Sequence, residues 1–286
     1  MAIQPSQLEI DNIVAASGLR LSNPTVPASN TDTGTQGDIS WDSNYLYVCT
    51  SGDTWKRAAL STWSELPVTA NLELWLDAND SSTITLNGST VSQWDDKSGN
   101  DYHVSQGTAS NQPTLTSSVL NSKNVLRFDG GDYLTNASAT PVGGSTNRTI
   151  FVVFNYTGSD IRYAFMLGPS AGSAGDNFGI TQEIAVRVQF GNRIWSSSVG
   201  SSHSIVSIVL DGTSTTDISA WQNGTSLGVS STLSNTVNTQ SSFGVGGQGA
   251  SMLIGDVAEV LVYSSALSTS DRESVESYLS NKWGIT

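Results

Sequence analysis

Carboxylate pairs are the residues of this sequence that most directly suggest chemistry, because hydrolysis of a glycosidic bond commonly uses two of them. Glu73 and Asp77 lie four positions apart in the segment LELWLD, so an extended chain places both on one face of a strand. No third acid completes a catalytic series with them. The glutamates of the chain are Glu9, Glu65, Glu73, Glu183, Glu259, Glu273 and Glu276.

The two histidines and the one cysteine lie in unrelated surroundings. His103 stands in DYHV, His203 in SSHS and Cys49 in YVCTS, so their spacing does not fit a zinc site. A Ser-His-Asp arrangement is left open by the spacing. One cysteine allows no intrachain disulfide, and we expect Cys49 to be a small buried hydrophobic residue of a strand.

Two aspartates flank a pair of glycines in the segment FDGGD. Asp129 and Asp132 could offer oxygen ligands to calcium, which is the one metal that the sequence suggests. The alternative, which turn chemistry favours, is that both carboxylates accept hydrogen bonds from backbone N–H groups of a turn. No cofactor is required by either interpretation. A second acidic loop, with Asp95, Asp96 and Asp101, is expected to be solvated.

Glycan binding would use exposed aromatic rings beside polar groups that form hydrogen bonds. The candidates on the middle strands are Tyr163, Arg187, Asn192 and Trp195, and Trp195 adjoins a serine-rich loop. The competing interpretation for each aromatic residue is packing in the core.

The elements that must position these residues are short strands separated by polar turns, a pattern typical of an antiparallel β-sandwich. The run TIFVVFNY at 149–156 predicts a strand buried on both faces, and Asn223-Gly224 predicts a hairpin turn. A helix is predicted at the C-terminal end, capped by Ser270 or Ser268 and stopped at Gly284. Its apolar face comprises Val275, Tyr278, Leu279 and Trp283.

Composition excludes several functional classes. The 286-residue chain carries 12 basic and 25 acidic residues, for a net charge of −13, which opposes binding to nucleic acid or to an anionic membrane. No apolar run approaches the length of a membrane span. The start MAIQPSQLEI does not resemble a secretory signal, so we expect synthesis and assembly in a cytoplasm.

Three regions follow from the change in composition along the chain. Residues 1–33 are predicted to be an extended arm, residues 34–66 a small β-hairpin module, and residues 67–286 the sandwich. The module is too small to be stable by itself, so we expect it to oligomerise, or to pack on a partner or on the main domain.

Several ordered segments of residues 70–286 resemble a known family. LELWLDAND, VSQWDDKSGNDY, VLRFDGGDYL, TIFVVF and GDVAEVLVYSSALS, followed by the helix ESVESYLSNKWG, are similar to laminin-G-like, concanavalin A-like jelly-roll domains of bacteria and phages. The resemblance implies two packed antiparallel sheets, with ligand sites on the concave face or on the rim loops. Glucanases of this fold carry E-x-D-x-x-E on one strand, and no glutamate of this chain begins that series, so the residues predict a protein that is not an enzyme.

The segment GDISWDSNYLYVCTSGDTWKR resembles a short module of tailed-phage virion proteins, especially fibres of marine phages. The two resemblances together predict a protein of the virion surface, of the tail-fibre or capsid-decoration type, which displays a lectin-like sandwich for adhesion to a host-surface glycan. Its N-terminal region would bind other virion proteins and favour a homo-oligomer. The alternative is a bacterial cell-surface or secreted carbohydrate-binding module, and a glucanase-type enzyme ranks third.

Overall fold

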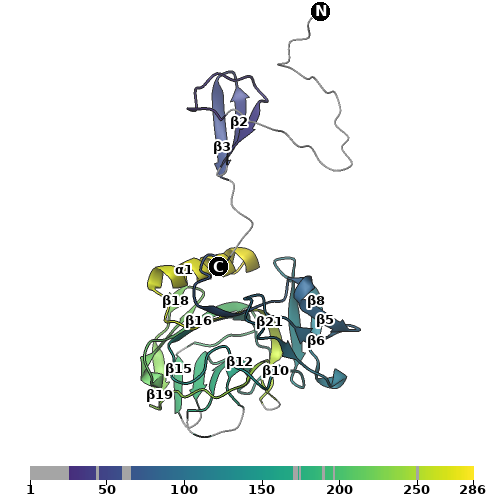
Figure 1. The fold of residues 1–286 in the computed structure, drawn as a ribbon, viewed down its shortest axis with the longest axis vertical. Coiled ribbons are helices and arrows are strands. Elements are labelled where there is room, and N and C mark those ends of the chain that lie inside the picture. Colours follow the sequence, from purple (N-terminus) through teal and green to yellow (C-terminus); the bar gives the residue numbers. More distant parts are fainter. Residues whose placement is uncertain are drawn as a thin grey trace, which may run out of the picture. The chain divides into compact units, whose positions relative to one another are not determined.

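The computed structural model describes residues 26–42, 45–59, 66–169, 173, 175–188, 191–195, 197–248 and 251–286. The chain forms two compact units, Met1–Glu65 and Leu66–Thr286, which are described separately (Figure 1). Most of the predicted N-terminal arm lies outside the described residues.

The smaller unit is a three-stranded antiparallel sheet in the order β1-β2-β3, formed by β1 (Ile39–Trp41), β2 (Tyr45–Ser51) and β3 (Thr54–Ala59). Cys49 is buried within it, as predicted. The backbone before the sheet packs on β3, because the Trp55 indole Nε1 donates to the Asp32 carbonyl at 3.1 Å and the Trp55 amide donates to the Asn30 carbonyl at 3.0 Å. The end of the predicted arm therefore contributes to this unit.

The larger unit is an antiparallel sandwich, which confirms the predicted fold class. In its first layer the strands pair in the order β18-β17-β16-β11-β21, and β21 then pairs with both β4 and β9. These strands are β4 (Leu72–Asp77), β9 (Lys123–Asp129), β11 (Arg148–Phe154), β16 (Ser204–Leu210), β17 (Ile218–Gln222), β18 (Thr225–Ser226) and β21 (Ile254–Tyr263).

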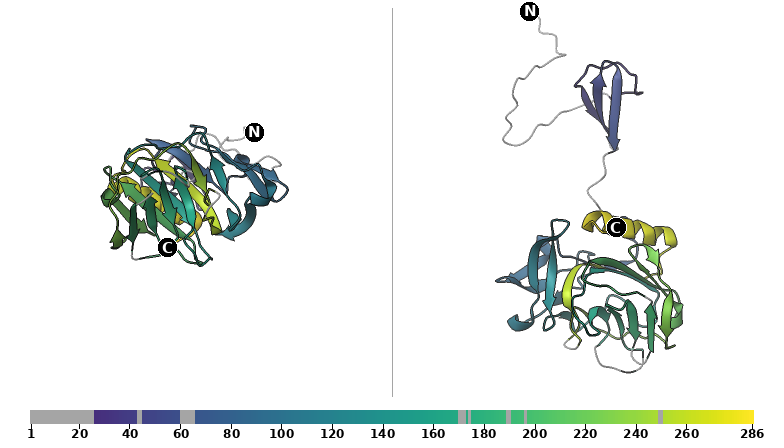
Figure 2. Two further views of the ribbon diagram at one scale, coloured as in Figure 1. Left: turned by 90° about the horizontal axis from the view of Figure 1, so that it is seen from below. Right: turned by 180° about the vertical axis from the view of Figure 1, so that it is seen from behind.

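The second layer pairs in the order β7-β10-β20-β12-β13-β14-β15-β19. These strands are β7 (Val104–Ser105), β10 (Leu134–Asn136), β12 (Tyr163–Leu167), β13 (Phe178–Thr181), β14 (Ala185–Val188), β15 (Gly191–Trp195), β19 (Val229–Thr232) and β20 (Phe243–Val245). The layers join at one edge through β5 (Ile84–Asn87), β6 (Thr90–Trp94) and β8 (Thr114–Leu120), as Figure 2 shows from two sides. Short 3-10 turns occupy Ser81–Thr83, Ala109–Asn111 and Thr215–Asp217.

Strand β11 is buried on both faces, as its sequence predicts. Its alternate residues Ile150, Val152 and Phe154 belong to the core between the layers. Phe151 and Val153 belong to a second core, which lies between the first layer and the C-terminal helix.

The helix α1 (Thr269–Trp283) covers the outer side of the first layer (Figure 1). Ser268 is its N-cap, and its hydroxyl accepts from the Asp271 amide at 3.2 Å, so the earlier of the two predicted caps is the one used. Gly284 ends the helix in the left-handed conformation, at φ 67°. The predicted apolar face is buried in the second core. This helix is too short and too polar to span a bilayer, and the described residues contain no other α-helix.

Candidate functional site

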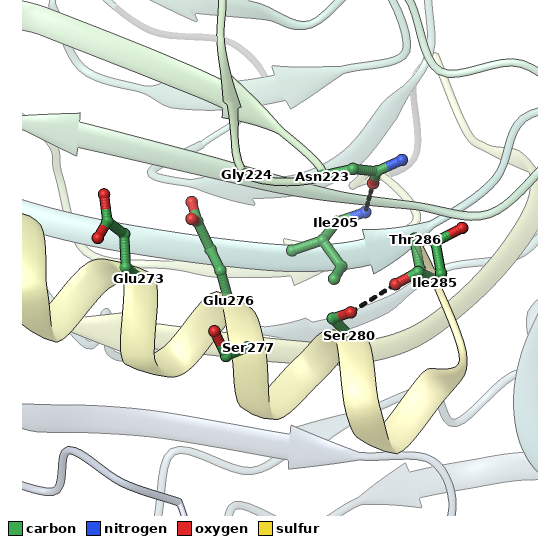
Figure 3. A pocket seen from close by; sticks show the side chains of 9 residues that line it. All are labelled: Ile205, Asn223, Gly224, Glu273, Glu276, Ser277, Ser280, Ile285 and Thr286. Atoms are coloured by element: carbon green, nitrogen blue, oxygen red, sulfur yellow. Dashed lines mark hydrogen bonds between the residues drawn. The ribbon is translucent and has the colours of Figure 1, made fainter.

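A pocket of about 350 Å³ lies between helix α1 and the turn that joins β17 to β18 (Figure 3). Its walls combine carboxylates, hydroxyls and two isoleucine side chains. The lining residues are Ile205, Asn223, Gly224, Glu273, Glu276, Ser277, Ser280, Ile285 and Thr286.

The predicted hairpin turn forms the sheet side of this pocket. Asn223 and Gly224 both have positive φ, 49° and 76°, as a two-residue hairpin turn requires. The Asn223 side-chain oxygen accepts from the Ile205 amide at 2.9 Å, and the Asn223 amide donates to the Ile205 carbonyl at 2.9 Å. These two bonds fix the turn on β16, so the sheet wall of the pocket is held in one position.

The helix side is a row of polar residues at helical spacing. Glu273, Glu276, Ser277 and Ser280 recur at intervals of three and four, which places them along one face of α1. The Ser280 hydroxyl donates to the Ile285 carbonyl at 2.5 Å and fastens the segment after the helix against the pocket.

One guanidinium group positions both glutamates. Arg272 donates from Nη1 to Glu276 Oε2 at 2.5 Å and from Nη2 to Glu273 Oε1 at 3.1 Å. It also lies 4.1 Å from the ring centroid of Trp221, so a cation–π contact holds it in place. The Arg272 side chain is itself buried, and its planar fork leaves little freedom to either carboxylate.

The two glutamates differ in their surroundings. The Glu273 side chain is 60% exposed, whereas that of Glu276 is 7% exposed. Glu276 Oε1 is buried and has no hydrogen-bond partner. The pocket therefore has one solvated carboxylate at its rim and one buried carboxylate in its wall.

No local sequence pattern predicts this pocket, because its walls come from distant parts of the chain. A signal for one residue was present. Glu276 follows Val275 and lies three positions before Leu279, and this spacing places a charged group beside the apolar face of the helix.

The predicted glycan-binding residues lie in the second layer. The Tyr163 ring rests on Gly179, where an added Cβ would lie 2.3 Å from Tyr163 Cε1. Backbone pairing joins Gly179 to Arg187, and Arg187 to Asn192, while the side chains of these last two residues lie outside the described part of the structure.

Trp195 requires a correction. Trp195 was a candidate ring for stacking on a sugar, with core packing as the competing interpretation, and it is 2% exposed within the core between the layers. Its position on β15 turns the indole inward, so it cannot stack on a sugar.

The two aspartates of FDGGD serve the turn itself. Asp129 Oδ1 accepts from the Gly131 amide at 2.8 Å, and Asp132 Oδ2 accepts from the Asp129 amide at 3.1 Å. Burial raises the pKa of Asp132 to about 6. No group of three or more His, Cys, Asp or Glu side chains suited to a metal ion occurs among the described residues.

Asp77 lies in a buried ionic network. It is one member of the candidate carboxylate pair Glu73 and Asp77. Asp77 Oδ2 contacts the ammonium groups of Lys97 at 3.0 Å and Lys282 at 2.9 Å. Lys282 also contacts Glu259 Oε2 at 2.8 Å, and Glu259 is fully buried. Asp77 and Glu259 are therefore both bound by lysines beneath α1. These two carboxylates stabilise the fold and are closed to a substrate.

A serine motif follows β12 in the sequence. Residues 168–172 read GPSAG, which fits the G-x-S-x-G pattern of a nucleophile elbow. That elbow requires a strand followed directly by a helix, whereas here β12 precedes the segment and β13 is the next described element. Residues 170–172 lie outside the described part of the structure, so no nucleophile is assigned there.

Comparisons with known proteins give two kinds of similarity, and no protein-family model matches the chain. An N-terminal stretch of 37 residues is 57% identical to a capsule K30/K69-specific depolymerase of Klebsiella phage K5-2. A stretch of 39 residues is 46% identical to a depolymerase of the same stated specificity from Klebsiella phage K64-1. These matches cover 13% and 14% of this chain, and they span only 5% of each relative's own length.

The fold is similar to that of a solved Trypanosoma rangeli sialidase in complex with sialic acid. The TM-score is 0.50 at 14% sequence identity, over 85% of this chain and 44% of that one. At this identity the likeness shows the β-rich fold alone. The comparisons do not name the laminin-G-like group, so that finer resemblance stays a prediction.

These matches correct the expectation that the protein is not an enzyme. The relatives that share the N-terminal stretch are named capsule-specific depolymerases. The expectation was wrong because it rested on the absence of the glucanase series E-x-D-x-x-E, and that series is only one of several ways to place two carboxylates.

Proposed function

We propose that this chain is a virion-associated, carbohydrate-active protein of a phage, which acts on a polysaccharide of the bacterial surface. The 57% identity over 37 residues to a phage capsule depolymerase is the observation that carries this proposal. The N-terminal segment would be the part that such proteins share, and the sandwich would be the part that meets the polysaccharide.

The pocket beneath α1 supports the proposal chemically. It contains a pair of carboxylates, Glu273 and Glu276, beside hydroxyl and amide groups that suit sugar hydroxyls. Hydrolysis of a glycosidic bond uses two carboxyl groups, so these glutamates are our candidates for the reacting pair. Glu273 lies at the solvated rim and Glu276 is buried, and Arg272 donates a hydrogen bond to each of them.

The test uses the purified full-length chain and a panel of capsular polysaccharides that begins with the K30 and K69 types. We expect at least one polymer to become shorter, as measured by light scattering after size separation and by the release of reducing ends. The heat-unfolded protein is the control. If every polymer keeps its length and none co-sediments with the protein, the proposal is wrong.

We further propose that the N-terminal region attaches the protein to other virion proteins, as a homo-oligomer. Particles assembled with a chain that lacks residues 1–60 should not contain the protein, while the sandwich should fold from its own cores. Immunodetection on purified particles measures this. Particles that still carry the shortened chain would show that attachment lies elsewhere.

A further inference from the structure

The smaller unit has a pocket of its own, with a volume of about 310 Å³. Residues 29–30 form one wall, and strands β2 and β3 form the other. The lining residues are Ser29, Asn30, Tyr47, Trp55, Lys56 and Arg57. Aromatic and basic residues therefore border the same small cavity.

The pairing of β2 with β3 places both rings and the arginine on one face of the sheet. Tyr47 pairs with Arg57, and Cys49 pairs with Trp55. Paired residues, and residues two apart on a strand, direct their side chains to the same face. The Trp55 indole Nε1 donates to the Asp32 carbonyl at 3.1 Å, so the tryptophan ring is fixed before any ligand arrives.

Arg57 has an orientation but no carboxylate partner among the described residues. Its guanidinium carbon lies 4.1 Å from the centroid of the Tyr45 ring, which is a cation–π contact. Such a contact holds the plane of the guanidinium and leaves its N–H groups for an acceptor. The Arg57 side chain is exposed, so an acceptor from outside can reach it.

The acidic residues of residues 26–59 do not neutralise this pocket. Each of them accepts a hydrogen bond from a backbone amide of the same unit; they are Asp32, Asp38, Asp42 and Asp53. The same range contains two basic residues, Lys56 and Arg57, and both line the pocket. Neither forms an ion pair within the part of the chain that the structure describes. The unpaired positive charge of the unit is therefore gathered at one cavity.

A ligand that suits these walls carries a negative charge on a short apolar stem. A carboxylate can accept two N–H groups of the arginine fork at once. Methylene groups can pack on the rings of Tyr47 and Trp55. The side chain of a glutamate has both parts, whereas a basic group would be repelled by Lys56 and Arg57.

We propose that this pocket binds an acidic side chain of another virion protein, with Arg57 paired to its carboxylate. The inference rests on the proposed attachment of the N-terminal region, and it deepens that proposal by naming the chemistry of the partner. One exposed ion pair is weak by itself. Several copies of the protein that bind together would give a firm attachment, which agrees with the proposed homo-oligomer.

The first experiment titrates the ¹⁵N-labelled full chain with the blocked peptide Gly-Glu-Glu-Gly and with its neutral counterpart Gly-Gln-Gln-Gly. We expect saturable shifts of the Trp55 indole N–H and the Arg57 amide signals with the glutamate peptide. The glutamine peptide should bind about tenfold more weakly or not at all. The methyl glycoside of glucuronic acid is the third probe, because it carries the same carboxylate on a sugar.

Three results of this titration would overturn the inference. They are an equal response to the two peptides, the absence of any saturable shift up to about 10 mM peptide, and binding of the glucuronide as tight as that of the glutamate peptide. The last result would assign the pocket to an acidic polysaccharide.

A matched pair of variants removes one positive charge from each unit. Arg57→Gln should abolish the shift of the Trp55 indole signal, and Lys123→Gln, on β9 of the sandwich, should leave it unchanged. Arg57→Lys keeps the charge without the fork, so it should bind the glutamate peptide several-fold more weakly. The position of the Trp55 indole signal without peptide shows whether each variant keeps the fold of the smaller unit. Unchanged binding by a folded Arg57→Gln would refute the role of Arg57.

The second experiment measures incorporation into particles by immunodetection. Arg57→Glu reverses the charge at the pocket and should lower incorporation about tenfold, whereas Lys123→Glu should not. Normal incorporation of Arg57→Glu, together with exclusion of the chain that lacks residues 1–60, would refute the pocket and keep the attachment. Incorporation of the shortened chain would refute the attachment, and the peptide titration would then decide the pocket by itself.

Discussion

Replacing Lys282 by methionine should destabilise the sandwich strongly at neutral pH and much less at pH 5. The Lys282 ammonium lies 2.8 Å from Glu259 Oε2 and 2.9 Å from Asp77 Oδ2. The substitution keeps most of the side-chain volume and removes the charge. Glu259 is then a fully buried carboxylate without a cation in contact.

The size of the destabilisation is set by the free-energy cost of protonating Glu259. Burial already raises the pKa of Glu259, and loss of Lys282 raises that pKa further, so the variant relieves the buried charge by taking up a proton. Protonating a glutamate with an ordinary value of 4.5 at pH 7 costs about 1.4 kcal/mol for each pH unit, about 3 kcal/mol in all. At pH 5 the same step costs less than about 1 kcal/mol.

The remaining donors around Glu259 do not replace the ammonium. Trp75 Nε1 donates to Oε1 at 2.8 Å, Trp283 Nε1 donates to Oε2 at 2.5 Å, and the Tyr278 hydroxyl lies 3.3 Å from Oε1. These groups are neutral. A buried pair that loses one partner typically costs 3 to 5 kcal/mol, which agrees with the value from proton uptake.

The assay is urea unfolding of the full chain at pH 7 and pH 5, followed by tryptophan fluorescence. Lys123→Met is the control, because Lys123 has no ion pair within the described residues and undergoes the same chemical change. We expect a loss of about 3 kcal/mol for Lys282→Met at pH 7 and about 1 kcal/mol at pH 5. A loss of the same size at both pH values would refute the reasoning, since it would mean that Glu259 gains no proton in the variant.

Two further predictions test other parts of the sandwich. Asp132 has a folded pKa of about 6, above its ordinary value of 3.8, so its contribution to stability is present at low pH and is lost as pH rises through 6. Asp132→Asn should therefore raise the free energy of unfolding by about 1 to 3 kcal/mol at pH 8 and leave it nearly unchanged at pH 4. A gain in stability that does not depend on pH would contradict the raised pKa of Asp132 as its cause. Gly284→Ala should lower the free energy of unfolding by about 1 kcal/mol, because the cap has φ 67° and an added Cβ would lie 3.1 Å from the Asn121 side chain. An unchanged melting temperature would show that the helix end adapts.

Local patterns were enough to predict most elements of the sandwich. The unbroken apolar run at 149–156 predicts a doubly buried strand, and β11 is one, because side chains alternate between two faces and both faces needed apolar residues. Asn223-Gly224 predicts the hairpin because few other residue pairs accept positive φ at both positions. The helix and its glycine stop follow from spacing within one segment.

The site depended on contacts that no local pattern records. The exposure of Trp195 on β15 depends on which face of the strand meets the opposite layer. Its side chain lies on that inner face and is buried in the core. The pocket needs Ile205, the 223–224 turn and Glu276 at one place, and these come from a strand, a hairpin and the last helix.

The sequence by itself determined the class of fold, the doubly buried strand, the hairpin turn and the capped helix, since each depends on the backbone preferences and periodicity of neighbouring residues. Only the tertiary structure decided that Glu259 and Asp77 share Lys282, and that Arg272 binds both Glu273 and Glu276 beside the hairpin turn. The physical reason is that charge pairing and pocket shape depend on distances across the fold, and those distances are set by how the layers and the helix pack.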